Sequence, residues 1–249
     1  MSCKVVLTLW GDLQSYGTDS MAYDRGAGDF PSRSAVTGMI LCALGADGAQ
    51  EELLSTMASG FHMEVQSFGE RTLLDDYHTI SSQYKDLSQN EESKVLKDWY
   101  SGMCLRAAEP GKDVQGSGNK ISKRQYWTNR VFFVILDFKS KALARKVSSA
   151  LLSPVGTLVL GRKCCPPKVP IHHGVICETP EEVQQEIDIS LHGILTIMAG
   201  RGKKPELTPS GVCSEKPLDN SQKWVRNDVP VQFGRDKVYR SREVWVASA

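Results

Sequence analysis

The chain has 249 residues, of which 41% are hydrophobic and 24% charged, an ordinary balance for a soluble globular protein. Its 30 basic and 29 acidic residues exclude a bulk polycation, so any nucleic-acid partner must be met by locally concentrated charge. No stretch reaches the roughly 18 apolar residues of a membrane span, and the seven cysteines are scattered, so we expect a cytoplasmic protein with free thiols and no membrane partner.

Residues 5–10 read VVLTLW, which predicts a first strand, and the loop GDLQSYG follows it. A helix is predicted after the sequence PSRS, because Val36, Ile40 and Leu44 repeat at helical spacing. Its first turn holds Ser32, Arg33 and Ser34, where free backbone N–H groups and the helix dipole favour an anion. This turn fits a phosphate cradle or an ordinary serine N-cap, and both alternatives stay open.

A second short helix is predicted over residues 51–59, and FHMEVQSF at 61–68 alternates with period two, as a half-buried strand does. We expect residues 71–80 to return as the hairpin partner of that strand. Residues 81–122 are polar and interrupted by glycine and proline, which predicts a protruding thumb. The apolar run VFFVIL at 131–136 predicts a central strand buried on both faces, followed by a helix.

This order predicts an α+β fold, with a ferredoxin-like (RRM-like) βαββαβ body. We place the body in residues 1–80 and 123–155, the thumb insertion in 81–122, and a small β-rich C-terminal extension in 156–249. In the extension we expect an acidic helix at 180–186, a strand at 194–198, a mobile loop over 200–218, and two strands at 223–233 and 238–246.

Residues 160–167 read LGRKCCPP, which fits a metal site, a redox site or a stiff loop. Zinc ligands come from pairs spaced C-x₂₋₄-C, whereas Cys164 and Cys165 are adjacent and no second pair exists, so we predict no metal and no cofactor. A redox dithiol needs C-x-x-C at a helix start, which Pro166 and Pro167 forbid. We therefore predict a stiff turn that presents Arg162 and Lys163.

Six ordered blocks resemble the CasD family, the subunits of type I-E CRISPR Cascade that cap the 5′ end of the guide RNA. The blocks are GDLQSYG, GDFPSRSAVTGMILCALG, DYHTI, KRQYWTNRVFFVIL, LGRKCCPPKVPI and SREVWV. The resemblance implies binding of the crRNA 5′ handle and contact with the Cascade backbone subunit and large subunit, with target DNA met only indirectly. A glycine-rich loop lies near the RNA in this family; Gly11, Gln14 and Gly17 match it, whereas Asp12 and Tyr16 depart from the usual proline and tryptophan.

Single-stranded RNA is held by cations along its backbone and by rings or polar groups at its bases. The candidate RNA-binding residues carry such side chains: Gln14, Ser15, Tyr16, Arg25, Ser32, Arg33, Ser34, Tyr77, His78, Arg124, Tyr126, Arg162, Lys163 and Arg242. Alternation predicts that one of Tyr126 and Trp127 lies in the core. Arg242 fits a surface residue at a strand edge as well as an RNA contact.

Three functions stay open. A related Cascade subtype uses the homologous subunit as a metal-independent ribonuclease, and here the adjacent Tyr77 and His78, with Lys123 or Arg124, have the required residue types. In type I-E systems a separate subunit cuts the RNA, so the resemblance favours a non-catalytic clamp with no catalytic residues. The third function is a connector whose basic segments meet acidic protein surfaces.

Overall fold

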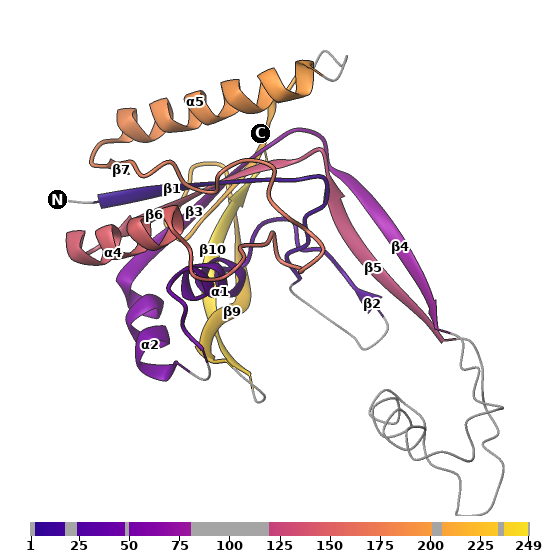
Figure 1. Ribbon diagram of the computed structural model, residues 1–249, viewed down its shortest axis with the longest axis horizontal. Helices are drawn as coiled ribbons and strands as arrows, with labels where there is room; N and C mark the ends of the chain where they lie inside the picture. Colours follow the sequence, from indigo (N-terminus) through magenta and orange to yellow (C-terminus); the bar gives the residue numbers. More distant parts are fainter. Residues whose placement is uncertain are drawn as a thin grey trace, which may run out of the picture.

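A computed structural model describes residues 3–17, 24–47, 50–80, 120–200, 206–233 and 237–248. These residues form a mixed α+β structure in which helices cover both faces of a seven-stranded antiparallel sheet, and a three-stranded sheet projects from its side (Figure 1). No helix in the described part of the chain has the length and apolar character that a membrane crossing requires.

The main sheet has the strand order β7-β1-β6-β3-β8-β10-β9. Its strands are β1 (Cys3–Trp10), β3 (Phe61–Phe68), β6 (Val131–Phe138), β7 (Ile176–Cys177), β8 (Pro209–Ser214), β9 (Gln222–Gln232) and β10 (Val238–Ala247). The second sheet consists of β2 (Asp24–Arg25), β5 (Lys120–Thr128) and β4 (Thr72–Ile80), in that order. The helices are α1 (Arg33–Ala43), α2 (Glu51–Gly60), α4 (Lys141–Leu152) and α5 (Pro180–Ala199).

Strand β6 lies between β1 and β3, and its side chains are buried on both faces, which confirms the prediction for this apolar run. On one face Phe132 packs in a cluster with residues of α1, α2 and α4. On the other face Phe133 packs in a second cluster with Val183 and Ile187 of α5. The core therefore has two layers, one on each side of the sheet (Figure 1).

Helix α5 confirms the predicted acidic helix at 180–186 and continues well past it, to Ala199. Thr179 and Glu182 form a reciprocal capping box at its start, and the buried residues Val183, Ile187 and Ile194 lie on one face. The predicted strand at 194–198 is therefore wrong: Ile194 and its neighbours form the last turns of this helix, although β-branched residues there favour a strand in isolation. Packing of the apolar face on the sheet outweighs that local preference.

The C-terminal strands extend the main sheet beyond β3. Strands β9 and β10 confirm the two predicted strands, and they curl past α1 and α2 (Figure 1). The predicted mobile loop over 200–218 is wrong in its second half, because β8 pairs with β3 on one side and β10 on the other. Residues 201–205 lie outside the described residues.

Strand β4 pairs with β5 along its whole length, from Thr72 opposite Thr128 to Ile80 opposite Lys120. The predicted hairpin of 61–68 with 71–80 is therefore wrong. Strand β3 pairs with β6 on one side and with β8 on the other, so neither side is open to β4. Gly69, with a φ of +90°, turns the chain out of the main sheet. We call the projecting β4–β5 pair the ladder (Figure 1). Of the predicted thumb at 81–122, residues 120–122 belong to β5, and the remainder lies outside the described residues.

Candidate nucleic-acid interface

A cleft of about 1110 Å³ opens beside the first turn of α1. Its walls come from residues 15–17 and 25–29, from α1, from residues 157–162 and from the β9–β10 end of the sheet. The cleft therefore brings together segments that are distant in sequence. Six of the predicted RNA-binding residues line it: Ser15, Tyr16, Arg25, Ser32, Ser34 and Arg162.

The charge of the cleft is positive. The described lining has four cationic residues, Arg25, Arg162, Arg226 and Lys237, and two acidic ones, Asp29 and Asp228. Both acids are paired with arginines outside the lining: Asp29 with Arg71 at 2.5 Å, and Asp228 with Arg242 at 2.6 Å. Because both acids are paired with arginines outside the lining, the described lining carries a net positive charge, and the cleft favours an anionic ligand such as a phosphate backbone.

Arg162 braces the mouth of this cleft. Its Nη1 donates to the Gln125 carbonyl at 3.3 Å, and its Nη2 donates to the Arg25 carbonyl at 3.0 Å. Its guanidinium carbon lies 4.7 Å from the centroid of the Tyr126 ring. Both Tyr126 and Trp127 are buried, which corrects the expectation that only one would be, because Arg162 covers Tyr126. Arg25 and Lys163 are exposed next to this brace.

The LGRKCCPP segment forms the tight turn that the sequence predicts. The Leu160 amide donates to the Cys165 carbonyl at 2.8 Å, and the Cys165 amide donates to the Arg162 carbonyl at 2.9 Å. Gly161 has a φ of +91°, and a Cβ there would lie 1.8 Å from the Ser15 carbonyl oxygen. Only glycine therefore allows this turn to pack against the glycine-rich loop.

The two adjacent cysteines differ in environment. Cys164 is exposed, whereas Cys165 is buried, and burial raises the pKa of the Cys165 thiol to about 12. A thiol with so high a pKa is a poor nucleophile and metal ligand at neutral pH. Among the described residues, no three histidine, cysteine or acidic side chains are grouped as a metal site requires.

Gln14 and Tyr16 stabilise the glycine-rich loop from the inside. The Tyr16 hydroxyl donates to Gln14 Oε1 at 3.0 Å, and Gln14 Nε2 donates to the Arg130 carbonyl at 2.6 Å. Ser15 is buried and donates to the Gln125 carbonyl at 2.9 Å. These side chains shape the wall of the cleft and have few free polar atoms. Asp12, which departs from the family pattern, is ion-paired with Lys168, so its charge does not oppose an anion.

Arg33 lies in the interior, although its sequence position favours a phosphate contact. It is 2% exposed, its Nη1 donates to Glu215 at 2.5 Å, and its Nη2 donates to three backbone carbonyls at the end of α2 and the start of β3. Ser32 is the N-cap of α1 and accepts from the Ala35 amide at 3.3 Å. The guanidinium of Arg33 therefore stabilises the fold and is not available to bind RNA, which corrects the prediction for this residue.

Arg242 is placed in the same buried network. Its Nε and Nη2 donate to the two oxygens of Asp228 at 2.6 and 2.9 Å, and its Nη1 donates to Glu215 at 2.6 Å. Burial alone would raise the pKa of Asp228, but hydrogen bonds and charge from Arg242 outweigh it and hold that pKa below its ordinary value. Arg242 is therefore neither a surface residue nor free to bind RNA, which corrects both sequence alternatives.

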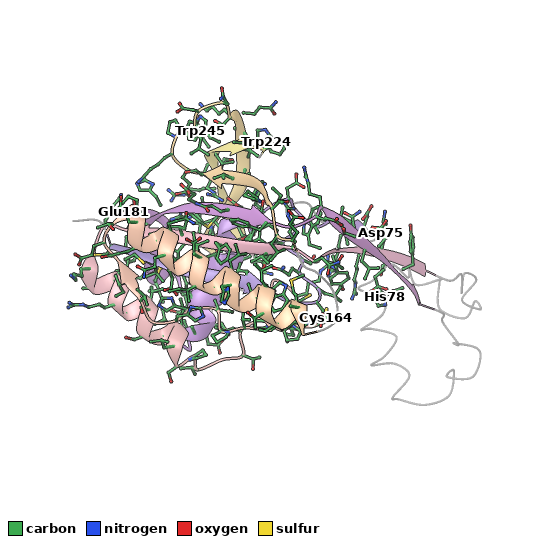
Figure 2. The ribbon with its side chains drawn as sticks, turned by 90° about the horizontal axis from the view of Figure 1, so that it is seen from above. Asp75, His78, Cys164, Glu181, Trp224 and Trp245 are labelled. Carbon is green, nitrogen blue, oxygen red and sulfur yellow. The ribbon has the colours of Figure 1, made fainter. Side chains whose placement is uncertain are left out.

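Tyr77, His78 and Arg124 lie on the ladder, outside the cleft lining. Lys123 pairs with Asp75 at 3.0 Å and lies 6.0 Å from the Tyr77 ring, whereas His78 Nε2 lies 2.5 Å from Asp76. Because side chains alternate along a strand, Tyr77 and His78 point to opposite faces of the ladder. Figure 2 shows Asp75 and His78 on this projection, apart from Trp224 and Trp245 at the far side of the sheet.

Strand β2 connects the cleft to the middle of the ladder. Arg25 is the register partner of Arg124, and Arg25 also lines the cleft. Cations therefore continue from Arg162 through Arg25 to Arg124. Such a row of cations is suited to an anionic backbone.

Sequence reasoning missed the contribution of β9 and β10 to the cleft. Trp224, Arg226, Lys237 and Tyr239 all line it. The signal available in the sequence was alternation, since Trp224 and Arg226 fall on one face of a strand. That pattern does not reveal that the face curls toward α1.

A family model described as CRISPR-associated protein (Cas_Cas5) matches residues 5–244. The chain is 23% identical over 186 residues to the CRISPR system Cascade subunit CasD of Escherichia coli (strain K12), covering 70% of this chain and 71% of that protein. A chain of a solved CRISPR RNA-guided surveillance complex superposes with a TM-score of 0.68 at 19% identity, covering 99% of this chain and 90% of that one. A crystal structure of a Cas protein gives a TM-score of 0.57 at 20% identity, covering 98% and 94%. Both structures share its fold.

Proposed function

Because this chain belongs to the Cas5 family of CRISPR-associated proteins, we propose that it is a non-catalytic subunit of a CRISPR RNA-guided surveillance complex. In this proposal it binds and caps the 5′ handle of the crRNA and links the Cascade backbone subunit to the large subunit. It works in the cytoplasm, and it meets target DNA only through the assembled complex. The relative in Escherichia coli is itself named a Cascade subunit, which supports this assignment.

The observation that carries the proposal is the positive cleft. Arg25 and Arg162 line it, Lys163 and Arg124 lie next to it, and its two acids are already paired. Single-stranded RNA needs cations spaced along its backbone, and the cleft together with the ladder supplies them. The strand order β7-β1-β6-β3, with α1 between β1 and β3 and α4 between β6 and β7, supports a ferredoxin-like βαββαβ body.

The ladder geometry supports binding without turnover. RNA cleavage through the 2′-hydroxyl needs a base, an acid and a cation around one phosphate. Tyr77 and Lys123 lie on one face of the ladder, and His78 lies on the other with Asp76. The ribonuclease alternative would need these groups to meet at a single phosphate.

Salt-dependent binding tests the clamp against the connector. The purified protein is titrated with handle RNA and with a shuffled RNA of the same length at several salt concentrations. We expect tighter binding of the handle and a fall of log K with log salt of roughly 0.7 per phosphate contacted. The variants Arg25→Gln and Lys163→Gln should reduce that slope, whereas Lys146→Gln, an exposed cation on α4, should not. A salt-independent affinity would instead favour a connector that meets acidic protein surfaces.

A further inference from the structure

Arg226 is a buried cation of the cleft whose guanidinium is not fully hydrogen-bonded by the described residues. It lies on β9, is 8% exposed and lines the cleft wall. Its Nη1 is buried and has no hydrogen-bond partner among the described residues. A buried charge without a hydrogen-bonded partner costs stability, so proteins keep such groups where a ligand completes them.

The neighbours of Arg226 do not complete it. The nearby Asp228 attracts the charge of Arg226, but both of its oxygens are engaged by Arg242, and its Oδ2 also accepts the Arg33 amide at 2.8 Å. On the neighbouring strand the register partner of Arg226 is Arg242, a like charge. The Phe30 ring lies 5.9 Å from the guanidinium carbon, which is a weak contact by comparison with an ion pair.

The first turn of α1 adds a second anion-favouring feature to the same cleft. Ser32, Ser34 and Ala35 line it at the positive end of an 11-residue helix. The Arg33 amide is taken by Asp228 and the Ala35 amide by the Ser32 hydroxyl. The Ser34 amide is left without a partner among the described residues, so it is available to an oxygen ligand.

An aromatic ring lies next to Arg226 along β9. Trp224 lines the cleft, is 42% exposed, and precedes Arg226 by two residues, which places both side chains on one face of the strand. Their separation along the strand is about 6.8 Å. One nucleotide can span this distance with its phosphate at the guanidinium and its base against the ring.

We propose that Arg226 and the first turn of α1 form a phosphate-binding site, and that Trp224 stacks on the base of the same nucleotide. The identity of the phosphate as part of the guide RNA rests on the proposed function. The phosphate chemistry itself does not, since a free phosphate would satisfy the same groups. Arg226 is a fork-shaped donor that two phosphate oxygens can match, which a lysine cannot do.

The test compares the full-length protein with Arg226→Met, Arg226→Lys and Arg240→Gln. Arg240 is exposed on β10 outside the cleft and serves as the matched charge control. We expect Arg226→Met to weaken handle RNA binding at least 10-fold and to lower the salt slope by roughly 0.7, with Arg226→Lys intermediate. Without ligand, Arg226→Met should melt at or above the wild-type temperature, because it removes a buried guanidinium whose Nη1 has no hydrogen-bond partner among the described residues, while Asp228 keeps Arg242. Arg240→Gln should match wild type.

Two further arms identify the source of the phosphate and the role of the ring. If inorganic phosphate raises the melting temperature of wild type but not of Arg226→Met, the site binds the free anion as well; if only RNA does so, it is specific to nucleic acid. Either result supports the site. Trp224→Leu should weaken RNA binding several-fold and Trp224→Phe should restore most of it. Loss of binding in both Trp224 variants would overturn the stacking role.

The outcomes separate this site from the proposed function. Wild-type RNA affinity and salt slope in Arg226→Met would overturn the site, and so would a lower melting temperature without ligand, which would make Arg226 structural. If handle RNA affinity is insensitive to salt and to Arg25→Gln, the proposed function fails instead. Stabilisation by inorganic phosphate that depends on Arg226 would then still support the anion site.

Discussion

Arg242 and Asp228 form a two-pronged ion pair inside the protein, with N–O distances of 2.6 and 2.9 Å and side chains 9% and 6% exposed. Asp228 also accepts the amide at the start of α1, and Arg242 shares Glu215 with Arg33. This network joins α1 to β9 and β10 across nearly 200 residues of sequence. It therefore fixes one wall of the cleft relative to the other.

Breaking this network should destabilise the fold strongly. Arg242→Met leaves the buried carboxylates of Asp228 and Glu215 without a shared partner, and we expect a loss of about 3–5 kcal/mol in the free energy of unfolding. Urea denaturation measures it. Lys223→Ala is the control, because the Lys223–Glu243 pair is more than half exposed and is worth less than about 1 kcal/mol. Equal losses of unfolding free energy in the two variants would show that the buried network stabilises the fold no more than an exposed ion pair.

The fold was predictable where local pattern and packing agree. The run at 131–136 and the first helix carry periods that match their environments, and both predictions are confirmed. The pairing of β4 with β5 was not predictable, because strand β8, some 140 residues beyond β3, competes for the edge of β3. Residues 194–198 favour a strand locally, and only their contact with the sheet makes them helical.

The candidate site was predictable at its loops but less so at its charges. The glycine-rich loop and the turn at Gly161 were both predicted to contribute to RNA binding, and both lie at the cleft. Arg33 and Arg242 carried the same sequence signal as Arg162, since a sequence shows a cation but not its distant acid. Arg226 was missed for the converse reason: Asp228 lies two residues along the chain, and the sequence does not show that Arg242 and the Arg33 amide occupy its oxygens.

The stability of the protein should fall through His172 as the pH drops below about 6.5. Burial lowers the pKa of His172 below 6.5. Its ring is hydrogen-bonded to the Val6 carbonyl at 3.0 Å and to the Ser148 hydroxyl at 2.8 Å. As pH falls through about 6.5, the unfolded chain takes up a proton that the folded chain refuses, so stability is lost at up to roughly 1.4 kcal/mol per pH unit.

Urea midpoints between pH 7.5 and 5 measure this effect. His172→Gln should flatten the dependence, whereas substitution of the exposed His192 on α5 should leave it as in wild type. A wild-type slope in His172→Gln would assign the pH dependence to another group.

The protein should not cleave CRISPR repeat RNA. With Tyr77 and His78 on opposite faces of the ladder, a single phosphate cannot reach both. Repeat RNA incubated with the protein in EDTA should stay intact on a denaturing gel at substrate excess, and Tyr77→Phe and His78→Ala should behave alike. Multiple turnover that either variant abolishes would establish the ribonuclease instead.

Substitutions of the two adjacent cysteines should differ in their effect on stability, and the stability of the protein should not depend on a bound metal. Cys164→Ser alters an exposed thiol and should change stability by less than about 0.5 kcal/mol, whereas Cys165→Ser buries a hydroxyl in an apolar site and should cost about 1–3 kcal/mol. Dialysis against EDTA should leave the melting temperature unchanged. Stoichiometric zinc in the purified protein, with a melting temperature that falls on its removal, would contradict this expectation.

Gly161→Ala should separate the two loops that meet at the cleft. The new methyl group would lie 1.8 Å from the Ser15 carbonyl oxygen at a φ of +91°, so the turn must move away and the Ser15–Leu160 hydrogen bond of 3.1 Å must lengthen. We expect a loss of at least about 2 kcal/mol in the free energy of unfolding, together with weaker RNA binding, because Arg162 moves with the turn. Gly193→Ala on α5 is the matched control: nothing lies within 4 Å of its added methyl, and alanine favours a helix, so that variant should be slightly more stable and bind RNA as wild type does. RNA binding that survives in Gly161→Ala would show that the position of Arg162 does not limit affinity.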